Sequence, residues 1–430
     1  MAQAKDCVLV IAGKSATTAV ADNMREVASR LETMYRRPFT MLVLHDPKIG
    51  LGVGFDDGFT KLEVNSKSTK QLHKALAPYH SRLMAVTCRS EDYIPVLQRV
   101  IPHVPYVSTP TVQSLEWATD KLLMRRRMAE YDKSITPAYT VVTDQSEEAI
   151  AKIKRKVGFP LVVKPTGLAA SVLVSVCYYE DELREVLKKT FKKLEKTHKK
   201  YKGRGEAKIV VEELIEGTQY SIDGYVNERG KVTYVPPVHI KSGRAIGFDD
   251  FFGYKQMTPV KLLSNKIRDM EQTATKGVHA LGLRNTSIHA ELIKTERNGW
   301  KLVEIGPRIG GFRHDLYELS YGFNHSFNDV LTRIPRKPII RRRRKGYTAA
   351  MKFFAKTEGV LSGIKGIRKI QELDSFYEIT VNKTKGDKLK FAKNGGKSVF
   401  NVILHNKSRS DLLADIRRLE RKVEIKVVKK

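Results

Sequence analysis

The sequence predicts a protein of mixed α/β and α+β class with two or three domains. Its 430 residues are too many for one simple core. Up to about residue 114, apolar runs alternate with helical patterns, as in a doubly wound α/β domain. Near the middle, Asn298-Gly299 separates two alternating runs and predicts a β-hairpin. Residues 346–430 follow with strands and a helix typical of a small α+β domain.

The first domain, 1–114, begins with a continuous apolar run that is typical of a buried parallel strand. Its expected strands are Cys7–Ala12, Phe39–Leu44, Leu83–Thr87 and Tyr106–Val107, with helices at Thr18–Met34 and Ser90–Val100. Gly13-Lys14-Ser15 is not a phosphate-binding loop, because Val8 stands where that motif requires its first glycine.

The middle region places one lysine where it could bind phosphate. Lys164 ends the strand Phe159–Lys164 and precedes Pro165 and the small-residue loop Thr166–Ser171. An ammonium group and backbone N–H groups can share the charge of a phosphate there. Lys121, inside the helix Leu115–Tyr131, would by itself be expected at the surface.

The other elements expected between residues 138 and 345 are predicted from the spacing of apolar residues and from helix start and stop signals. They are helices at Ser146–Val157, Asp181–Lys200, Asn265–Leu281 and Asp315–Ser320, and strands at Val172–Tyr178, Ile209–Leu214, Gln219–Val226 and Val232–Ile240. Glu212, Glu213, Leu214 and Ile215, at the end of a strand, could offer backbone hydrogen bonds to a flat base, although glutamates at a strand end are common.

The C-terminal residues predict three strands, a helix and a last strand. The strands are Ala349–Phe354, Phe376–Val381, Ser398–His405 and Val423–Val428, and the helix is Ser410–Arg421.

The predicted hairpin sorts its side chains onto two faces. With Asn298 and Gly299 as a two-residue turn, Arg297 faces Trp300, Ile293 faces Glu304 and Glu291 faces Gly306. Because side chains alternate along a strand, one face is apolar. That face carries Ile288, Ala290, Leu292, Val303 and Ile305, and the opposite face carries His289, Glu291, Glu304 and Arg308.

Glu291 and Glu304 are then diagonal neighbours on the polar face. Two carboxylates repel one another unless a positive charge lies between them, and Mg²⁺ prefers such oxygen ligands. The alternative, two solvated glutamates on an open face, is equally compatible with these residues alone.

The strongly positive net charge bears on which partners or substrates the protein could bind. The net charge of +31 could attract a polyanionic partner or an anionic substrate, or it could reflect a cytosol in which basic proteins are common. Basic residues gather at Lys188–Arg204, Arg336–Lys345 and the C-terminus without any nucleic-acid-binding motif, so a solvated surface is expected before anion binding.

Three cysteines without paired spacing argue against disulfides and thiolate metal sites. No run is long enough to span a membrane, and a cytoplasmic location is expected.

Four stretches, in this order, resemble the ATP-grasp superfamily, and specifically its carboxylate-amine ligases. The stretches are Asp120-Lys121, Phe159 to Pro165, Val211 to Ser221 and His289 to Gly311. The likeness is clearest from about residue 115 to 333. It implies an N-terminal Rossmann-like pre-ATP-grasp domain (1–114), an ATP-grasp domain (115–335) whose mobile lid spans about 138–215, and a C-terminal α+β domain (346–430).

The resemblance also implies roles for individual residues. Lys121 and Lys164 would contact ATP phosphates, the loop containing Ser171 would cover them, and Arg308 would lie beside the reacting groups. The remaining assignments are Glu212, Glu213, Leu214 and Ile215 for adenine, Gln219 for ribose, and Glu291 and Glu304 for magnesium. Manganese could replace magnesium.

Three positions depart from the family pattern. Gly306 stands where many members have asparagine, so water or phosphate must complete the metal shell. Gln219 replaces the frequent ribose carboxylate, and the loop Thr166–Ser171 contains a single glycine.

The predicted function is therefore an ATP- and magnesium-dependent ligase that joins a small carboxylate to an amine through an acyl phosphate. Two alternatives remain open: a ligase that adds amino acids to a polypeptide carboxylate, for which the basic surface would attract an acidic target, and a non-catalytic nucleotide- or nucleic-acid-binding relative. A small-molecule substrate is expected before nucleic acid, membranes are not expected, and a homodimer would be compatible with the family.

Overall fold

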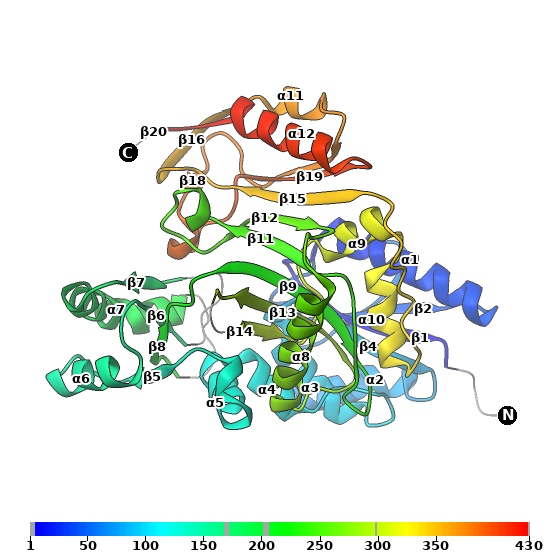
Figure 1. Cartoon of the computed structure of the whole chain (residues 1–430). Coiled ribbons are helices and arrows are strands. Elements are labelled where there is room, and N and C mark those ends of the chain that lie inside the picture. Colours follow the sequence, from blue (N-terminus) through cyan, green and yellow to red (C-terminus); the bar gives the residue numbers. More distant parts are fainter. Residues whose placement is uncertain (1–4, 167–171, 201–205, 297–298, 429–430) are drawn as a thin grey trace.

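The computed structural model describes residues 5–166, 172–200, 206–296 and 299–428. Long strands run through the middle of the molecule, with the other elements around them (Figure 1). In Figure 1 the N-terminal elements lie at the lower right, the strands β5 to β8 at the left and the C-terminal elements at the top. No helix among the described residues is long and apolar enough to cross a membrane.

The N-terminal part is a parallel four-stranded sheet in the order β3-β2-β1-β4. Its strands are β1 (Cys7–Ile11), β2 (Thr40–His45), β3 (Phe59–Glu63) and β4 (Leu83–Cys88), and its helices are α1 (Thr18–Tyr35), α2 (Thr69–Leu76) and α3 (Ile94–Val100). Helices pack on both faces, which explains why β1 is wholly buried and apolar throughout.

Two expectations for this sheet were wrong. Tyr106–Val107 is not a strand, because neighbouring prolines cannot donate to a strand ladder and leave too short a run. The fourth strand is instead β3, an edge strand in which only Leu62 is buried, so its sequence lacks a clear apolar pattern.

The predicted helix Leu115–Tyr131 is two helices, α4 (Val112–Thr119) and α5 (Lys121–Tyr131). Asp120 has an extended backbone, and its carboxylate accepts hydrogen bonds from Leu122 N and Leu123 N at 2.8 and 2.9 Å. It therefore caps a new helix rather than continuing the first. The cap makes Lys121 the first residue of α5.

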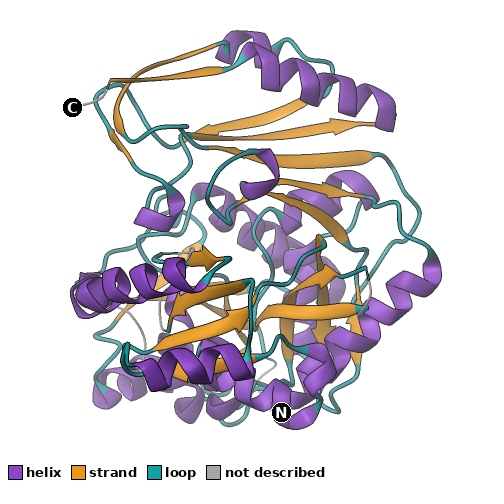
Figure 2. Ribbon diagram, turned by 60° about the vertical axis from the view of Figure 1, so that its left-hand side comes forward, coloured by secondary structure: helices purple, strands orange, loops and turns teal. Residues whose placement is uncertain are grey.

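A second, antiparallel sheet has the order β5-β8-β6-β7. Its strands are β5 (Tyr139–Val142), β6 (Leu161–Pro165), β7 (Ser175–Cys177) and β8 (Ile209–Glu213), and its helices are α6 (Glu147–Lys156) and α7 (Glu180–Lys200). The two helices and the sheet share one core of their own. This unit, called the lid below, projects to the left in Figure 1 and comes toward the viewer in Figure 2.

The largest sheet has nine strands, with eight in the order β14-β13-β9-β11-β12-β15-β19-β17 and β10 paired to β9. These strands are β9 (Thr218–Val226), β10 (Val232–Tyr234), β11 (Val238–Ser242), β12 (Gly253–Thr258), β13 (Thr286–Lys294), β14 (Trp300–Gly306), β15 (Tyr347–Phe353), β17 (Phe376–Val381) and β19 (Phe400–Asn406). The predicted strand Val232–Ile240 is divided into β10 and β11 by Pro236 and Pro237.

The central sheet crosses from the middle region into the C-terminal region, because β12 pairs with β15. Around it lie α8 (Ser264–Ala280), α9 (Arg313–Tyr321), α10 (His325–Arg333), α11 (Ile367–Gln371) and α12 (Arg409–Lys422). Beyond it, β16 (Gly359–Lys365), β18 (Lys388–Leu389) and β20 (Glu424–Val428) form a small sheet in the order β18-β16-β20. The domain division at residues 335–346 stays a prediction, since one sheet continues across it.

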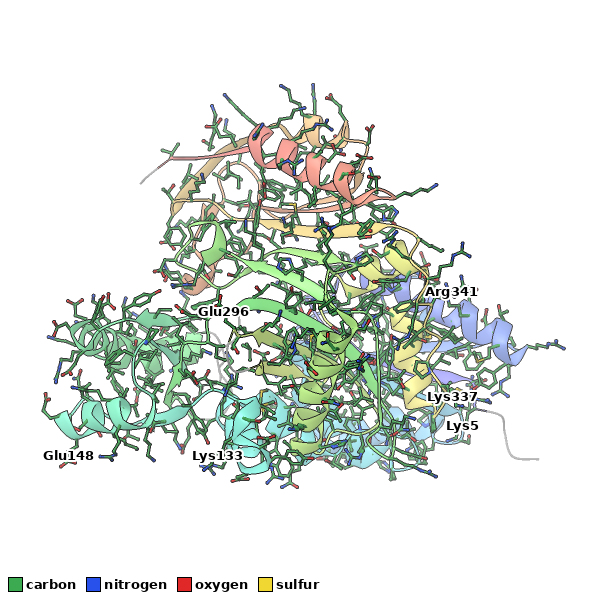
Figure 3. All side chains as sticks on the ribbon, in the orientation of Figure 1. Lys5, Lys133, Glu148, Glu296, Lys337 and Arg341 are labelled. Atoms are coloured by element: carbon green, nitrogen blue, oxygen red, sulfur yellow. The ribbon has the colours of Figure 1, made fainter. Side chains whose placement is uncertain are left out.

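The arginine-rich segment after α10 lies at the surface. Figure 3 shows Lys337 and Arg341 on the outer edge of the molecule, and both side chains are exposed. This position is compatible with a solvated basic surface.

The hairpin forms as predicted, but its register differs. Lys294 pairs with Trp300, so the connection is longer than a two-residue turn, and Glu291 pairs with Glu304 instead of Gly306. An irregularity between Glu291 and Leu292 adds one residue to β14. As a result Leu302 is buried in the core while Val303 is only partly buried, which corrects the predicted apolar face.

Candidate active site

Glu291 and Glu304 lie directly opposite one another on β13 and β14. Such cross-strand neighbours have Cβ atoms about 5 Å apart. Gln219 on β9 donates from Nε2 to Glu291 Oε2 at 3.0 Å, and His289 Nε2 lies 3.3 Å from Glu291 Oε1. The actual register therefore places the two carboxylates closer together than the diagonal arrangement predicted from the sequence.

The two carboxylates have opposite electrostatic surroundings. Burial would raise the pKa of Glu291, but hydrogen bonding and charge from His289, followed by Arg313, lower that pKa below its usual range. Burial raises the pKa of Glu304, and the charge of Glu91 raises it further, against the effect of Lys121. The protein therefore offsets the negative charge of Glu291 more completely than that of Glu304.

A buried network centred on Asp223 of β9 holds His289 in place. Asp223 Oδ1 is 2.7 Å from His289 Nδ1, and Asp223 Oδ2 accepts from Gly310 N at 2.8 Å and lies 3.1 Å from His325 Nε2. Burial opposes ionisation of Asp223, yet His289 and His325 lower its pKa well below the usual value. The network fixes the ring of His289 against Glu291.

Arg313, the first residue of α9, joins the same network. Its side chain is almost completely buried, and its Nη2 and Nη1 donate to Ser221 Oγ at 2.6 Å and Gln256 Oε1 at 2.5 Å. Its Nε lies 3.4 Å from Asp223 Oδ1. Arg313 is thereby a fixed positive charge behind Glu291.

Arg308 connects the hairpin to the N-terminal sheet. Its Nη2 donates to Glu91 Oε2 at 2.8 Å, and Glu91 lies just after β4, at the carboxyl end of a parallel strand. Burial alone would lower the pKa of Arg308, but Glu91 and then Glu304 raise it. The predicted catalytic arginine therefore faces the carboxylate pair and is oriented by a neighbouring sheet.

On the lid, Lys164 and Glu212 form a buried cluster with Arg125 of α5. Glu212 Oε2 accepts from Lys164 Nζ at 2.7 Å, and Glu212 Oε1 accepts from Arg125 Nε at 2.9 Å. Burial opposes the charge of Glu212, but Arg125 and Lys164 lower its pKa to about 2. The Glu212 carboxylate holds the two cations rather than facing solvent.

The charge of Lys121 acts on both Glu304 of the hairpin and Lys164 of the lid. Its charge lowers the pKa of Glu304, and it also lowers the pKa of Lys164, for which burial is the larger cause. Lys121 therefore lies within electrostatic reach of both the other predicted phosphate-binding lysine and Glu304.

The predicted adenine-binding segment is tied to the start of the lid. The backbone N–H of Glu213 donates to Ala138 O at 2.9 Å, and that of Leu214 donates to Pro160 O at 3.1 Å. These two N–H groups are therefore engaged within the protein, and hydrogen bonds to a base would come from carbonyl groups or from Ile215. Ser171 lies outside the described residues.

The C-terminal region contributes a lysine that the sequence did not reveal as a site residue. Lys352 lies on β15, and its Nζ is 5.4 Å from the centre of the Phe312 ring. Burial lowers the pKa of Lys352, with Glu291 acting against this shift and Arg313 adding to it. Lys352 therefore belongs to the same group of charges as Glu291.

The residues present fit a hard divalent cation only in part. Among the described residues, no group of three or more His, Cys, Asp or Glu side chains forms a complete metal shell. Glu291 and Glu304 nevertheless offer paired oxygen ligands from facing positions of β13 and β14, which is the ligand type that Mg²⁺ prefers. The remaining ligands would be water and phosphate oxygens, as the glycine at position 306 led us to expect.

Sequence reasoning missed Glu91, Arg125 and Lys352. Arg125 is one of three consecutive arginines, and only packing distinguishes it from its neighbours. Lys352 carries a signal that could have been used, because it is the one charged side chain in the apolar strand 347–353. Glu91 also carries a signal, since sites in parallel sheets lie beyond the carboxyl ends of strands.

Comparison with known proteins agrees with this geometry. Residues 157–315 match the family model described as an ATP-grasp domain. Residues 157–315 form an ATP-grasp domain. This match, together with the shared fold, confirms the predicted resemblance to ATP-grasp proteins and the predicted fold class.

Solved structures with the same ATP-grasp fold cover almost the whole chain. The L-amino acid ligase from Bacillus licheniformis superimposes with a TM-score of 0.74 at 15% identity and covers 99% of both chains. Phosphoribosylglycinamide synthetase from Anaerococcus prevotii gives 0.67 at 16% identity, over 99% of this chain and 100% of that one. The biotin carboxylase domain of the Hydrogenobacter thermophilus 2-oxoglutarate carboxylase, solved with MgADP and bicarbonate, gives 0.65 at 13% identity, over 98% and 91% of the two chains.

Proposed function

We propose that this ATP-grasp protein is an ATP- and magnesium-dependent ligase that joins a small carboxylate to an amine. The observation that carries the proposal is the direct pairing of Glu291 with Glu304, with Arg308 beside them and Lys121 close to Glu304. A protein that only binds anions has no use for two facing carboxylates. The fold shared with an L-amino acid ligase supports amino acids as the first substrates to test.

In the proposed reaction, a substrate carboxylate oxygen attacks the γ-phosphorus of ATP, and the bond to the β-phosphate breaks to release ADP. The amine nitrogen then attacks the acyl carbon, loses its proton and displaces phosphate, which leaves an amide. Mg²⁺, when bound at Glu291 and Glu304, would neutralise charge on the phosphates.

The chain's own residues would bind and orient. Lys121 and Lys164 would hold the phosphates of ATP, with Glu212 and Arg125 fixing the position of Lys164. Arg308, oriented by Glu91, would stabilise the charge that develops on the transferred phosphoryl group and the carboxylate.

The test is ADP release from the purified protein with ATP and Mg²⁺, across amino acids given singly and in pairs, with mass detection of any product. ADP formed only with a particular acid and amine would establish the ligase and name both substrates. Binding of ATP without ADP formation in any pair would contradict ligation of small amino acids. Binding of generic RNA without ATP consumption would instead support the non-catalytic alternative.

A further inference from the structure

A cavity of about 260 Å³ lies away from the carboxylate pair, between the central sheet and the C-terminal region. One wall is the loop between β11 and β12, with Phe248, Asp249 and Asp250. The other wall is Lys356 after β15 and Phe391 and Lys393 around the turn before β19. In Figure 1 this loop and turn lie together above β7. None of the candidate active-site residues lines the cavity.

Two of the four charged groups in this cavity already neutralise one another. Lys393 Nζ donates to Asp249 Oδ2, and Arg244 Nη1 also lies 3.5 Å from Asp249 Oδ1. The carboxylate of Asp249 and the ammonium of Lys393 therefore need no charged ligand.

The other two groups, Asp250 and Lys356, form no ion pair with any described residue. Asp250 is 3% exposed, and its Oδ2 accepts from Lys393 N at 2.8 Å, while its Oδ1 makes no hydrogen bond of ordinary geometry among the described residues. Burial raises the pKa of Asp250, and the backbone N–H groups of Lys393, Phe251 and Phe252 act against this rise. A buried carboxylate oxygen without a donor is costly. Lys356 is exposed and forms no ion pair with any described residue. The cavity thus presents a carboxylate and an ammonium to one molecule, with the rings of Phe248 and Phe391 beside them.

We propose that this cavity is a second ligand site that binds a free amino acid. Its ammonium group would donate to Asp250, its carboxylate would pair with Lys356, and an apolar side chain would pack against Phe248 and Phe391. The volume, slightly below that of pockets for drug-sized ligands (about 300–1,000 Å³), suits a molecule of amino-acid size.

The site lies where the lid meets the rest of the chain. Leu173 N, at the described edge of the lid loop, donates to Lys393 O at 3.0 Å. Arg244 Nη2 donates to Tyr178 Oη, just beyond β7, at 2.9 Å. Both walls of the cavity are therefore bonded to the lid, so a molecule that holds the walls together stabilises the lid contacts.

The site is separate from the carboxylate pair, since neither Glu291 nor Glu304 lines it. Lys352, which belongs to the charges around Glu291, and Lys356 are four residues apart, which is at most about 14 Å along the chain. Occupancy of one site can therefore be measured while the other is disabled.

The experiment is isothermal titration calorimetry of the full-length protein without nucleotide, with each amino acid and with analogues that lack either the amine or the carboxylate. We expect an apolar amino acid to bind at least about tenfold more tightly than either analogue. Lys356→Gln, at an exposed position, and Asp250→Asn should each weaken binding about tenfold or more. Lys388→Gln, an exposed lysine on β18, is the matched control and should bind as the unchanged protein does.

Glu304→Ala distinguishes this site from the carboxylate pair. Binding retained in Glu304→Ala and lost in Lys356→Gln supports the proposal, and slower hydrogen exchange at residues 173–177 on addition of the amino acid supports the link to the lid. Binding lost in Glu304→Ala and unchanged in Lys356→Gln would overturn it, as would the absence of heat with every amino acid. Since no ATP is present, these results do not depend on whether the protein is a ligase.

Discussion

The two strands of the central hairpin each carry a glutamate at facing positions, but the surroundings of the two carboxylates differ. On the β13 side, Glu291 is contacted by His289 and Gln219, with Arg313 behind it. On the β14 side, Glu304 is partly buried near Glu91 and Glu291, and its pKa is raised. The difference teaches that the protein alone stabilises one charged carboxylate, while the second is suited to a cation that arrives with the nucleotide.

The largest expected effect comes from removing the β14 carboxylate. Glu304→Ala should lower ADP formation by about a thousandfold or more, because the divalent cation loses one of its two protein ligands. The exposed residue Glu216 provides a control variant, Glu216→Ala, which should keep full activity. Undiminished ADP formation by a folded Glu304→Ala protein would remove Glu304 from the metal site.

The next test addresses the support on the β13 side. His289→Ala should weaken the apparent affinity for Mg²⁺ by roughly 10–100-fold, since residues that orient metal ligands have effects of this size. The measurement is the Mg²⁺ dependence of ADP formation at saturating ATP. An unchanged Mg²⁺ dependence would mean that His289 supports only the fold.

Substitutions of Lys352 test whether the positive charge near Glu291 binds the carboxylate of the acid substrate. Lys352→Met should raise the KM for the acid substrate by about tenfold, because an ion pair to its carboxylate is lost, with little change in the KM for ATP. Lys352→Arg keeps the charge and should recover most of the affinity. Equal changes in both KM values for Lys352→Met would contradict a role toward the acid.

A smaller effect is expected in the pH dependence of stability. A carboxyl group whose pKa is raised on folding destabilises the protein as pH rises, because the folded state must release a proton that it holds more tightly. Without metal, Glu304→Gln should therefore raise Tm by roughly 1–3 °C at pH 8 and not at pH 4, and Mg²⁺ with ADP should remove this advantage.

Asp315 is the matched control for that comparison. Burial, followed by the charge of Glu378, raises its pKa to about 6, so stability is lost as pH rises from about 4 through 6. Asp315→Asn should remove that loss, and Mg²⁺ should have no influence on it. A Mg²⁺ effect of equal size on both variants would show that it does not act at Glu304.

The smallest effect is expected at Gly306. A Cβ added there would meet only ordinary contacts, at 3.8 Å from Arg308 Cγ and 4.0 Å from Glu91 Oε2. Gly306→Asn should therefore leave Tm unchanged and tighten Mg²⁺ binding by a few-fold at most, which thermal melting and a Mg²⁺ titration can measure. A large fall in Tm would show that this space is more restricted than the contacts indicate.

The sequence predicted the hairpin and its polar face because local signals set them: alternation within the strands, and a turn residue between them. It did not predict the register, since the connection is longer than the two-residue turn that Asn298-Gly299 indicated and one extra residue in β14 changes the pairing again. Arg125, Glu91 and Lys352 reach the site from α5, from the end of β4 and from β15, and such long-range packing leaves little trace in one sequence. The cap at Asp120 is local, and its residue type could have indicated the helix boundary.

The most direct test of the paired-carboxylate account is a crystal structure with Mn²⁺ and a non-hydrolysable ATP analogue, with anomalous scattering used to locate the metal. The account predicts a peak within about 2.0–2.3 Å of one oxygen of Glu291 and one of Glu304. A bound analogue whose metal contacts neither carboxylate would contradict it.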